Sequence, residues 1–174
     1  VEASNGVVHV VDKVLVPEAA LTQLEEIAAA ERSLVDVVVS TDALSILEAA
    51  VIKADLVATL SGAGPFTVFA PTNDAFVALL NALGDDYNSL DDFDTEAEIN
   101  LLRNILLYHV IPANVLAADL AAGNVGTALT DNSIEVIASG NTFVIGDASS
   151  TNANITGTDI LASNGVAHTI DKVL

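Results

Sequence analysis

The stretch Phe66-Thr-Val-Phe-Ala-Pro-Thr-Asn-Asp-Ala-Phe76 holds the pattern that decides how this chain folds. Its first five residues are aromatic, β-branched or small, which is typical of a buried strand, and Pro71 stops that strand. Thr72-Asn73-Asp74 then offers side-chain oxygens that can cap a helix. The helix that follows has apolar residues at helical spacing as far as Gly84: Phe76, Leu79, Leu80 and Leu83.

Further helical patterns lie on both sides of this stretch. Before it, we expect a helix at about residues 17–32, a second from Ser40-Thr41-Asp42 to about residue 54, and a short helical turn at 55–60. After it, residues 85–94 are acidic and aperiodic, which indicates an exposed loop. Thr95 and Glu98 form a capping box, and the helical stripe after them runs to the break at Pro112.

The last third of the chain changes to strand patterns. Strands are predicted at residues 134–138, 142–146, 153–157 and 166–173, and Ser139-Gly140-Asn141 is a hairpin turn between the first two. A chain with helices in its first part and strands in its last part is typical of an α+β domain. The lone early strand, Phe66 to Ala70, is expected to join the late strands in one sheet or in a packed pair of sheets.

A thirteen-residue segment occurs twice, at Ala3–Leu15 and at Ala162–Leu174, with ten identical positions at an offset of 159 residues. This spacing is the size of a whole globular domain, whereas solenoid units span about 20–50 residues. We therefore expect residues 1–15 to be the last strand of a preceding unit in a tandem repeat. Residues 16–174 would then form the domain itself, with the helix at about 17–32 as its linker.

Composition excludes several classes of function. The formal net charge is −19 with only five Lys and Arg residues, so nucleic acid is not an expected partner. No apolar run approaches the roughly 20 residues of a spanning helix, so membrane insertion of this segment is not expected. Such an acidic protein, built as a tandem repeat, suits a secreted, cell-surface or periplasmic location.

No constellation of catalytic or metal-binding residues is evident. The chain has no Cys, and His9 and His168 occupy the same position of the two repeat copies. A calcium-loop register that starts at Asp92 places Ala97 where Gly is needed and Arg103 where Glu is needed. Strand alternation predicts that His168 is a half-buried residue of the fold. We expect no enzyme activity, no metal and no cofactor.

Three segments of this chain resemble the fasciclin domain family in the family's order: Phe66–Phe76, Leu107–Pro112 and Gly165–Leu174. The resemblance implies an α+β fold in which a helical layer packs on a β-wedge of two small sheets. It also implies a secreted or surface-anchored, multi-domain protein with a role in cell adhesion. In animal members integrin binding is associated with a Tyr-His segment and an Asp-Ile pair, which Tyr108, His109, Asp159 and Ile160 match. These four residues could instead serve the packing of the core and bind no partner.

Two functions follow as expectations. The first is a non-catalytic adhesion or interaction module of a bacterial surface protein, which would bind extracellular matrix, a cell-surface macromolecule or neighbouring repeats. Head-to-tail self-association through the repeated strand is an open alternative. The second function is binding of a small apolar ligand, a carotenoid or a lipid. An adhesive module is expected to carry an exposed patch and no deep pocket, whereas an apolar cavity lined by Leu and Phe favours the ligand.

Overall fold

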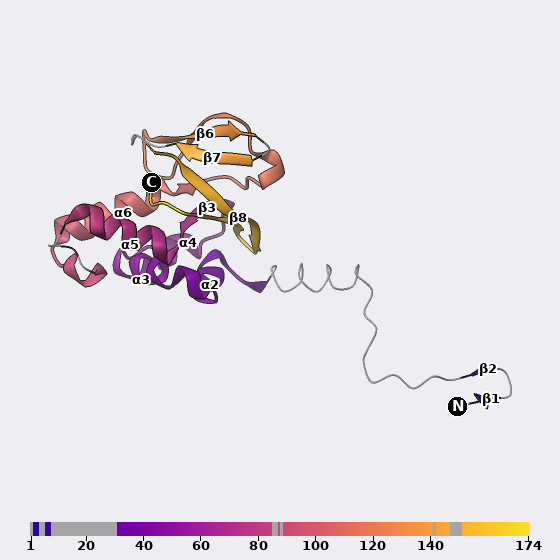
Figure 1. Cartoon of the computed structure of the whole chain (residues 1–174). Helices are drawn as coiled ribbons and strands as arrows, with labels where there is room; N and C mark the ends of the chain where they lie inside the picture. The colour runs from indigo at the N-terminus through magenta and orange to yellow at the C-terminus, as the bar shows by residue number, and fades with distance from the viewer. Residues whose placement is uncertain are drawn as a thin grey trace.

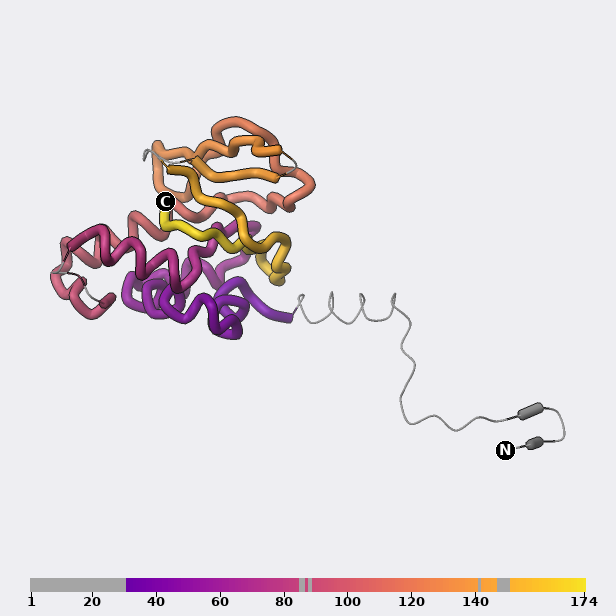
Figure 2. The backbone as a smooth tube through the Cα atoms, in the orientation of Figure 1, coloured from indigo at the N-terminus to yellow at the C-terminus, as the bar shows by residue number. Residues whose placement is uncertain are grey.

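The computed structural model describes residues 31–84, 87, 89–140, 142–146 and 151–174, together with the strand residues 2–3 and 6–7. The linker helix expected at about 17–32 therefore lies almost wholly outside the described residues. The same holds for residues 8–15 of the first repeat copy. Figure 2 shows the described backbone from residue 31 onward in colour.

Helices form one layer of the domain, and Figure 1 shows them gathered on one side of the strands. The α-helices among the described residues are α2 (Leu34–Val39), α3 (Ser45–Lys53), α4 (Val57–Leu60), α5 (Asn73–Leu83) and α6 (Glu96–Tyr108). The same part of the chain also forms short 3₁₀ turns at η1 (Asp42–Leu44), η2 (Leu90–Asp92) and η3 (Ala117–Asp119). The predicted second helix is thus η1 followed by α3, and the predicted turn at 55–60 is α4.

Seven strands form the main sheet: β3 (Phe66–Pro71), β4 (Val110–Ile111), β5 (Gly123–Gly126), β6 (Ser133–Ser139), β7 (Thr142–Gly146), β8 (Ala153–Ala162) and β9 (Gly165–Ile170). Their order is β4-β3-β9-β8-β7-β6-β5. Only the β3–β9 pair is parallel, and the other neighbours run antiparallel. A separate two-stranded ladder joins β1 (Glu2–Ala3) to β2 (Gly6–Val7). The α+β class is confirmed.

The parallel pair brings the two strands of the quoted motifs together at the centre of the sheet. Phe66 lies opposite Gly165, and the register continues to Pro71 opposite Ile170. The two backbones lie so close where the pair begins that a Cβ on Gly165 would collide with the carbonyl oxygen of Phe66. A Cβ on Gly64, whose φ is +56°, would likewise collide with the Asn164 carbonyl.

Asn164, which is 9% exposed, ties this end of the sheet to the helices. Its side-chain oxygen accepts a hydrogen bond from the Leu34 N–H at 2.9 Å, at the start of α2. Its Nδ2 donates to the carbonyl oxygens of Leu60 at 2.7 Å and Gly62 at 2.8 Å, at the end of α4. A single buried amide therefore holds two helices against the β8–β9 turn.

The sheet separates two hydrophobic cores. Val68, Ala70 and Ala167 belong to the core shared with the helices. Phe69 and Ile170 belong to a second core, which they share with β6 and β7. Because β9 lies between two strands and has a core on each face, His168 is 0% exposed. The prediction that His168 is half-buried was therefore wrong.

Several local predictions are confirmed, and others were wrong or incomplete. The strand from Phe66 and the helix that follows it are β3 and α5, and β6 and β7 form the predicted hairpin around Gly140. The hydroxyl of Thr72 makes no capping bond to α5. Instead the Asn73 side chain accepts from the Ile46 N–H at 3.0 Å and so caps α3. Elements that had not been predicted include α2, β4, β5 and the 3₁₀ turns η2 and η3.

The capping box at the start of α6 is present as predicted. The hydroxyl of Thr95 donates to Oε2 of Glu98 at 2.6 Å, and the Thr95 N–H donates to the same oxygen at 2.9 Å. The Tyr87 hydroxyl donates to Oε1 at 2.9 Å. These bonds, with those from Thr95 the largest, lower the pKa of Glu98 from its ordinary 4.5 to about 2.

We predict that Glu98 makes the stability of the domain depend on acid pH. A carboxyl with a lowered folded pKa stabilises the fold above its unfolded pKa, and this contribution is lost as pH falls through the folded value. The difference in unfolding free energy between wild type and Glu98→Gln should therefore be largest above about pH 5 and should shrink toward pH 2. Urea unfolding from pH 7 to pH 2 measures it. Glu96→Gln, in the same helical turn, is the control, and an equal pH profile for both variants would contradict the assignment.

Candidate functional site

His109, the first candidate residue, is a buried part of the framework. It follows the last residue of α6 and is 1% exposed. Its Nε2 accepts a hydrogen bond from the Leu174 N–H at 2.9 Å. The proton therefore sits on Nδ1, which donates to the carbonyl oxygen of Ile105 at 2.7 Å. The His109 ring thus joins the end of α6 to the segment that follows β9.

Tyr108, the residue before His109, is half-buried and faces the second core. Its hydroxyl donates a hydrogen bond to the carbonyl oxygen of Ser133 at 2.9 Å, at the start of β6. Tyr108 and His109 therefore face different parts of the protein. Tyr108 contacts the late strands, and His109 contacts the end of the chain.

Asp159 and Ile160 lie in β8 beside its irregular register, which shifts between Gly157 and Ile160. Asp159 has a φ of +56°, and its exposed side chain accepts a hydrogen bond from the Ala117 N–H at 2.8 Å. Ile160 is half-buried against the helical core. The shift in register leaves Asp159 on the surface and turns Ile160 inward.

The buried His168 connects Asp159 to the rest of the sheet. Its Nδ1 accepts from the Asp159 N–H at 3.2 Å, so Nε2 carries the proton and donates to the Val115 carbonyl at 2.9 Å. The His168 ring also stacks on Phe69, with ring centroids 5.6 Å apart. Both ring nitrogens of this histidine are used in holding backbone, which is a structural role.

The four candidate residues do not form one cluster. Tyr108 and His109 adjoin β4, whereas Asp159 and Ile160 belong to β8, and β3 and β9 lie between those strands. Three strand spacings correspond to about 14 Å. Of the four residues, only Asp159 is exposed.

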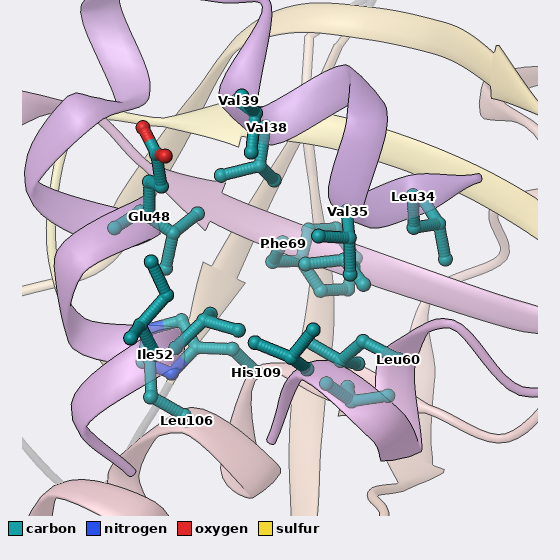
Figure 3. A pocket seen from close by; sticks show the side chains of 15 residues that line it. Leu34, Val35, Val38, Val39, Glu48, Ile52, Leu60, Phe69, Leu106 and His109 are labelled. Atoms are coloured by element: carbon teal, nitrogen blue, oxygen red, sulfur yellow. The ribbon is translucent and has the colours of Figure 1, made fainter. Parts of the chain in front are cut away.

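A second candidate site, which residue-by-residue reading of the sequence did not locate, is an apolar cavity of about 240 Å³ in the helical layer (Figure 3). It lies among α2, α3, α4, the end of α6 and the strands β3 and β4. The lining is formed by fifteen residues: Leu34, Val35, Val38, Val39, Leu47, Glu48, Val51, Ile52, Val57, Leu60, Val68, Phe69, Leu106, His109 and Val110. The surface that these residues present to the cavity is entirely apolar.

The cavity opens to solvent between apolar side chains. Val39 is 53% exposed, Ile52 59% and Val57 37%. Glu48 is half-buried, and Figure 3 shows its carboxylate turned away from Phe69. A cavity lined by Leu and Phe is the feature expected of an apolar-ligand site and not of a purely adhesive module. The sequence gives only a weak signal for this cavity, because the lining residues come from five separate segments of the chain.

Two further observations bear on the chemistry. Among the residues described by the structure, no group of three or more His, Cys, Asp or Glu side chains is placed to hold a metal ion. Within the same part of the chain, no helix has both the length and the apolar character needed to cross a membrane.

Comparison with known proteins agrees with this architecture. The family model described as "Fasciclin domain" matches residues 42–174. Protein sll1483 of Synechocystis is 37% identical over 142 residues, which are 82% of this chain and 72% of that protein. Human periostin is 33% identical over 172 residues, but the chain spans only 18% of its length. The immunogenic protein MPB70 of Mycobacterium bovis is 33% identical over a stretch that covers 70% of this chain and 55% of that protein.

A solved structure shows the same fold. It is a FAS1 domain pair from the insect cell adhesion molecule fasciclin I, with a TM-score of 0.56 and 21% sequence identity. The match covers 76% of this chain and 45% of the insect chain. With the family model matching most of its length, and with its signature strands paired at the centre of the sheet, this chain belongs to the fasciclin domain family.

Proposed function

We propose that this chain is a non-catalytic interaction module of a multi-domain protein that is secreted or held at the cell surface or in the periplasm. The repeated closing segment carries this proposal, since tandem modules are suited to presenting several copies of one binding surface. The solved structure with the same fold comes from a cell adhesion molecule. The net charge of −19 disfavours nucleic acid, which leaves matrix, a cell-surface macromolecule or neighbouring repeats as partners.

The strand pairing at the two ends of the chain supports the proposed domain boundary. In the N-terminal ladder Glu2 pairs with Val7 and Ala3 with Gly6. At the end of the domain Leu161 pairs with Val166 and Ala162 with Gly165. These are the same pairs, 159 positions apart, so the repeated sequence forms the same hairpin. We assign residues 1–15 to the end of a preceding domain and residues 16–174 to this one.

We predict that deleting residues 1–15 leaves the domain folded and equally stable. The free energy of unfolding in urea should change by less than about 0.5 kcal/mol, because the deleted strand belongs to another domain. Light scattering on the same samples measures the mass. A dimer of the full chain that is lost on deletion would contradict this assignment and support head-to-tail exchange of the strand.

Within this module, we assign partner contact to Asp159 and a positioning role to His109. Asp159 presents a carboxylate at the surface of β8. The ring of His109 is buried and both of its nitrogens bond to backbone, so it acts by fixing the end of α6. Tyr108 and Ile160 are half-buried and pack against different cores. The family resemblance at all four positions is therefore consistent with one contact residue and three that support the fold.

We predict that Asp159→Asn reduces adhesion at least about fivefold, the effect of losing about 1 kcal/mol of binding. Asparagine tolerates a positive φ and its amide oxygen can still accept from Ala117, so the fold is kept. Retention of chain-coated beads on cells of the source organism and on extracellular matrix measures adhesion. Asp131→Asn is the matched control, because Asp131 is also exposed and has a φ of +61°. Equal retention of both variants would contradict the assignment.

The cavity of about 240 Å³ favours a second candidate function, the binding of a small apolar ligand such as a carotenoid or a lipid. An apolar cavity of this size would otherwise leave its lining without packing partners. The two functions use different surfaces. Asp159 lies on β8, whereas the cavity lies within the helical layer, so a module of this kind could carry both.

A further inference from the structure

We propose that the cavity in the helical layer selects an uncharged hydrocarbon group of about ten carbon atoms and rejects anionic amphiphiles such as fatty acids. This inference rests on the second candidate function, ligand binding in the cavity, and adds the size and charge of the ligand. Three properties of the lining support it: its volume, its lack of polar surface and the charge beside its mouth.

The volume sets the size of the guest. An apolar cavity of 150 Å³ in another protein holds one benzene molecule, so a cavity of about 240 Å³ holds roughly ten carbon atoms. That is the size of one ring with a short substituent, or of a short alkyl chain. A longer molecule would place only one end inside, and the remainder would pass over Val39 and Ile52, whose exposed side chains are apolar.

The lining offers an anionic guest no cationic partner. None of the fifteen lining residues is Lys or Arg. His109 is the one lining residue with ring nitrogens, and both of them face backbone groups: Nδ1 bonds to Ile105 and Nε2 to Leu174. A carboxylate drawn into the cavity would lose its hydration and gain no donor in return, which is strongly unfavourable.

The charge beside the mouth also opposes an anion. Glu48 is a lining residue on α3, half-buried beside the apolar side chains of the opening. The protein as a whole carries a net charge of −19. An anionic headgroup outside the cavity would therefore meet a negative carboxylate at short range, in surroundings that screen it less than bulk water does. An uncharged hydroxyl or hydrocarbon end would not.

The test compares two probes of the same chain length, 1-decanol and decanoate, by titration calorimetry on the full chain at pH 7.5. We expect 1-decanol to bind with one site and decanoate to bind at least about tenfold more weakly. Equal affinities would overturn the charge selection while leaving ligand binding intact. No binding of either probe would overturn ligand binding itself.

A charge-reversal pair isolates the role of Glu48. Glu48→Lys should bring decanoate to within about threefold of 1-decanol, because the repulsion at the mouth becomes attraction. Glu135→Lys changes the net charge equally, but Glu135 is exposed on β6, away from the cavity lining, and should leave the preference unchanged. A similar gain in both variants would show that overall charge, and not Glu48, sets the preference.

A filling variant locates the bound probe. Val35 is half-buried on α2 and lines the cavity. The larger side chain of Val35→Phe should fill part of the cavity and weaken the binding of 1-decanol at least about tenfold. Val77→Phe, at an exposed position of α5, is the control. On the wild-type chain, 1-decanol should shift the methyl resonances of Val38 and Leu60 and leave those of Ile134 and Ile145 in the second core unchanged. Shifts confined to the second core would overturn the location.

Discussion

The parallel pairing of β3 with β9 is the contact on which the rest of this domain depends. It joins residues about a hundred positions apart, and its first pair, Phe66 with Gly165, brings the two backbones too close for a side chain on Gly165. Asn164 extends the contact into the helical layer through bonds to α2 and to the end of α4. The two segments that identify the family are therefore neighbours in space.

The pair also lies beside both proposed functional surfaces. On one face, Val68 contributes to the helical core and to the apolar cavity. Phe69, which belongs to the second core and also lines the cavity, stacks on His168, whose ring holds the backbone of Asp159 in β8. A ligand in the cavity and a partner at Asp159 would thus be connected through Phe69 and His168 of one pair of strands. The buried ring of His168, with both nitrogens bonded to backbone groups, helps to hold β9 in place.

Local chemistry made much of the fold predictable from sequence. The strand at Phe66, the helix after it, the Thr95 capping box and the Gly140 hairpin each carry their own signal within a few residues. Short elements such as β4 were missed, because two residues have no periodicity. The full burial of His168 and the existence of the cavity depend on which elements pack together. A pattern of a few neighbouring residues does not indicate that packing. The candidate residues were found by resemblance alone, and the structure shows which of them is exposed.

The central role of the β3–β9 contact is tested most directly by the free energy of unfolding of Gly165→Ala against Gly126→Ala in urea. A methyl group at Gly165 has no room beside the Phe66 carbonyl, so the strands must separate, and we expect a loss of about 3 kcal/mol or more. Gly126, in β5, has open space around it, and its substitution should change stability by less than about 1 kcal/mol. Equal and small losses in the two variants would contradict this account of the fold.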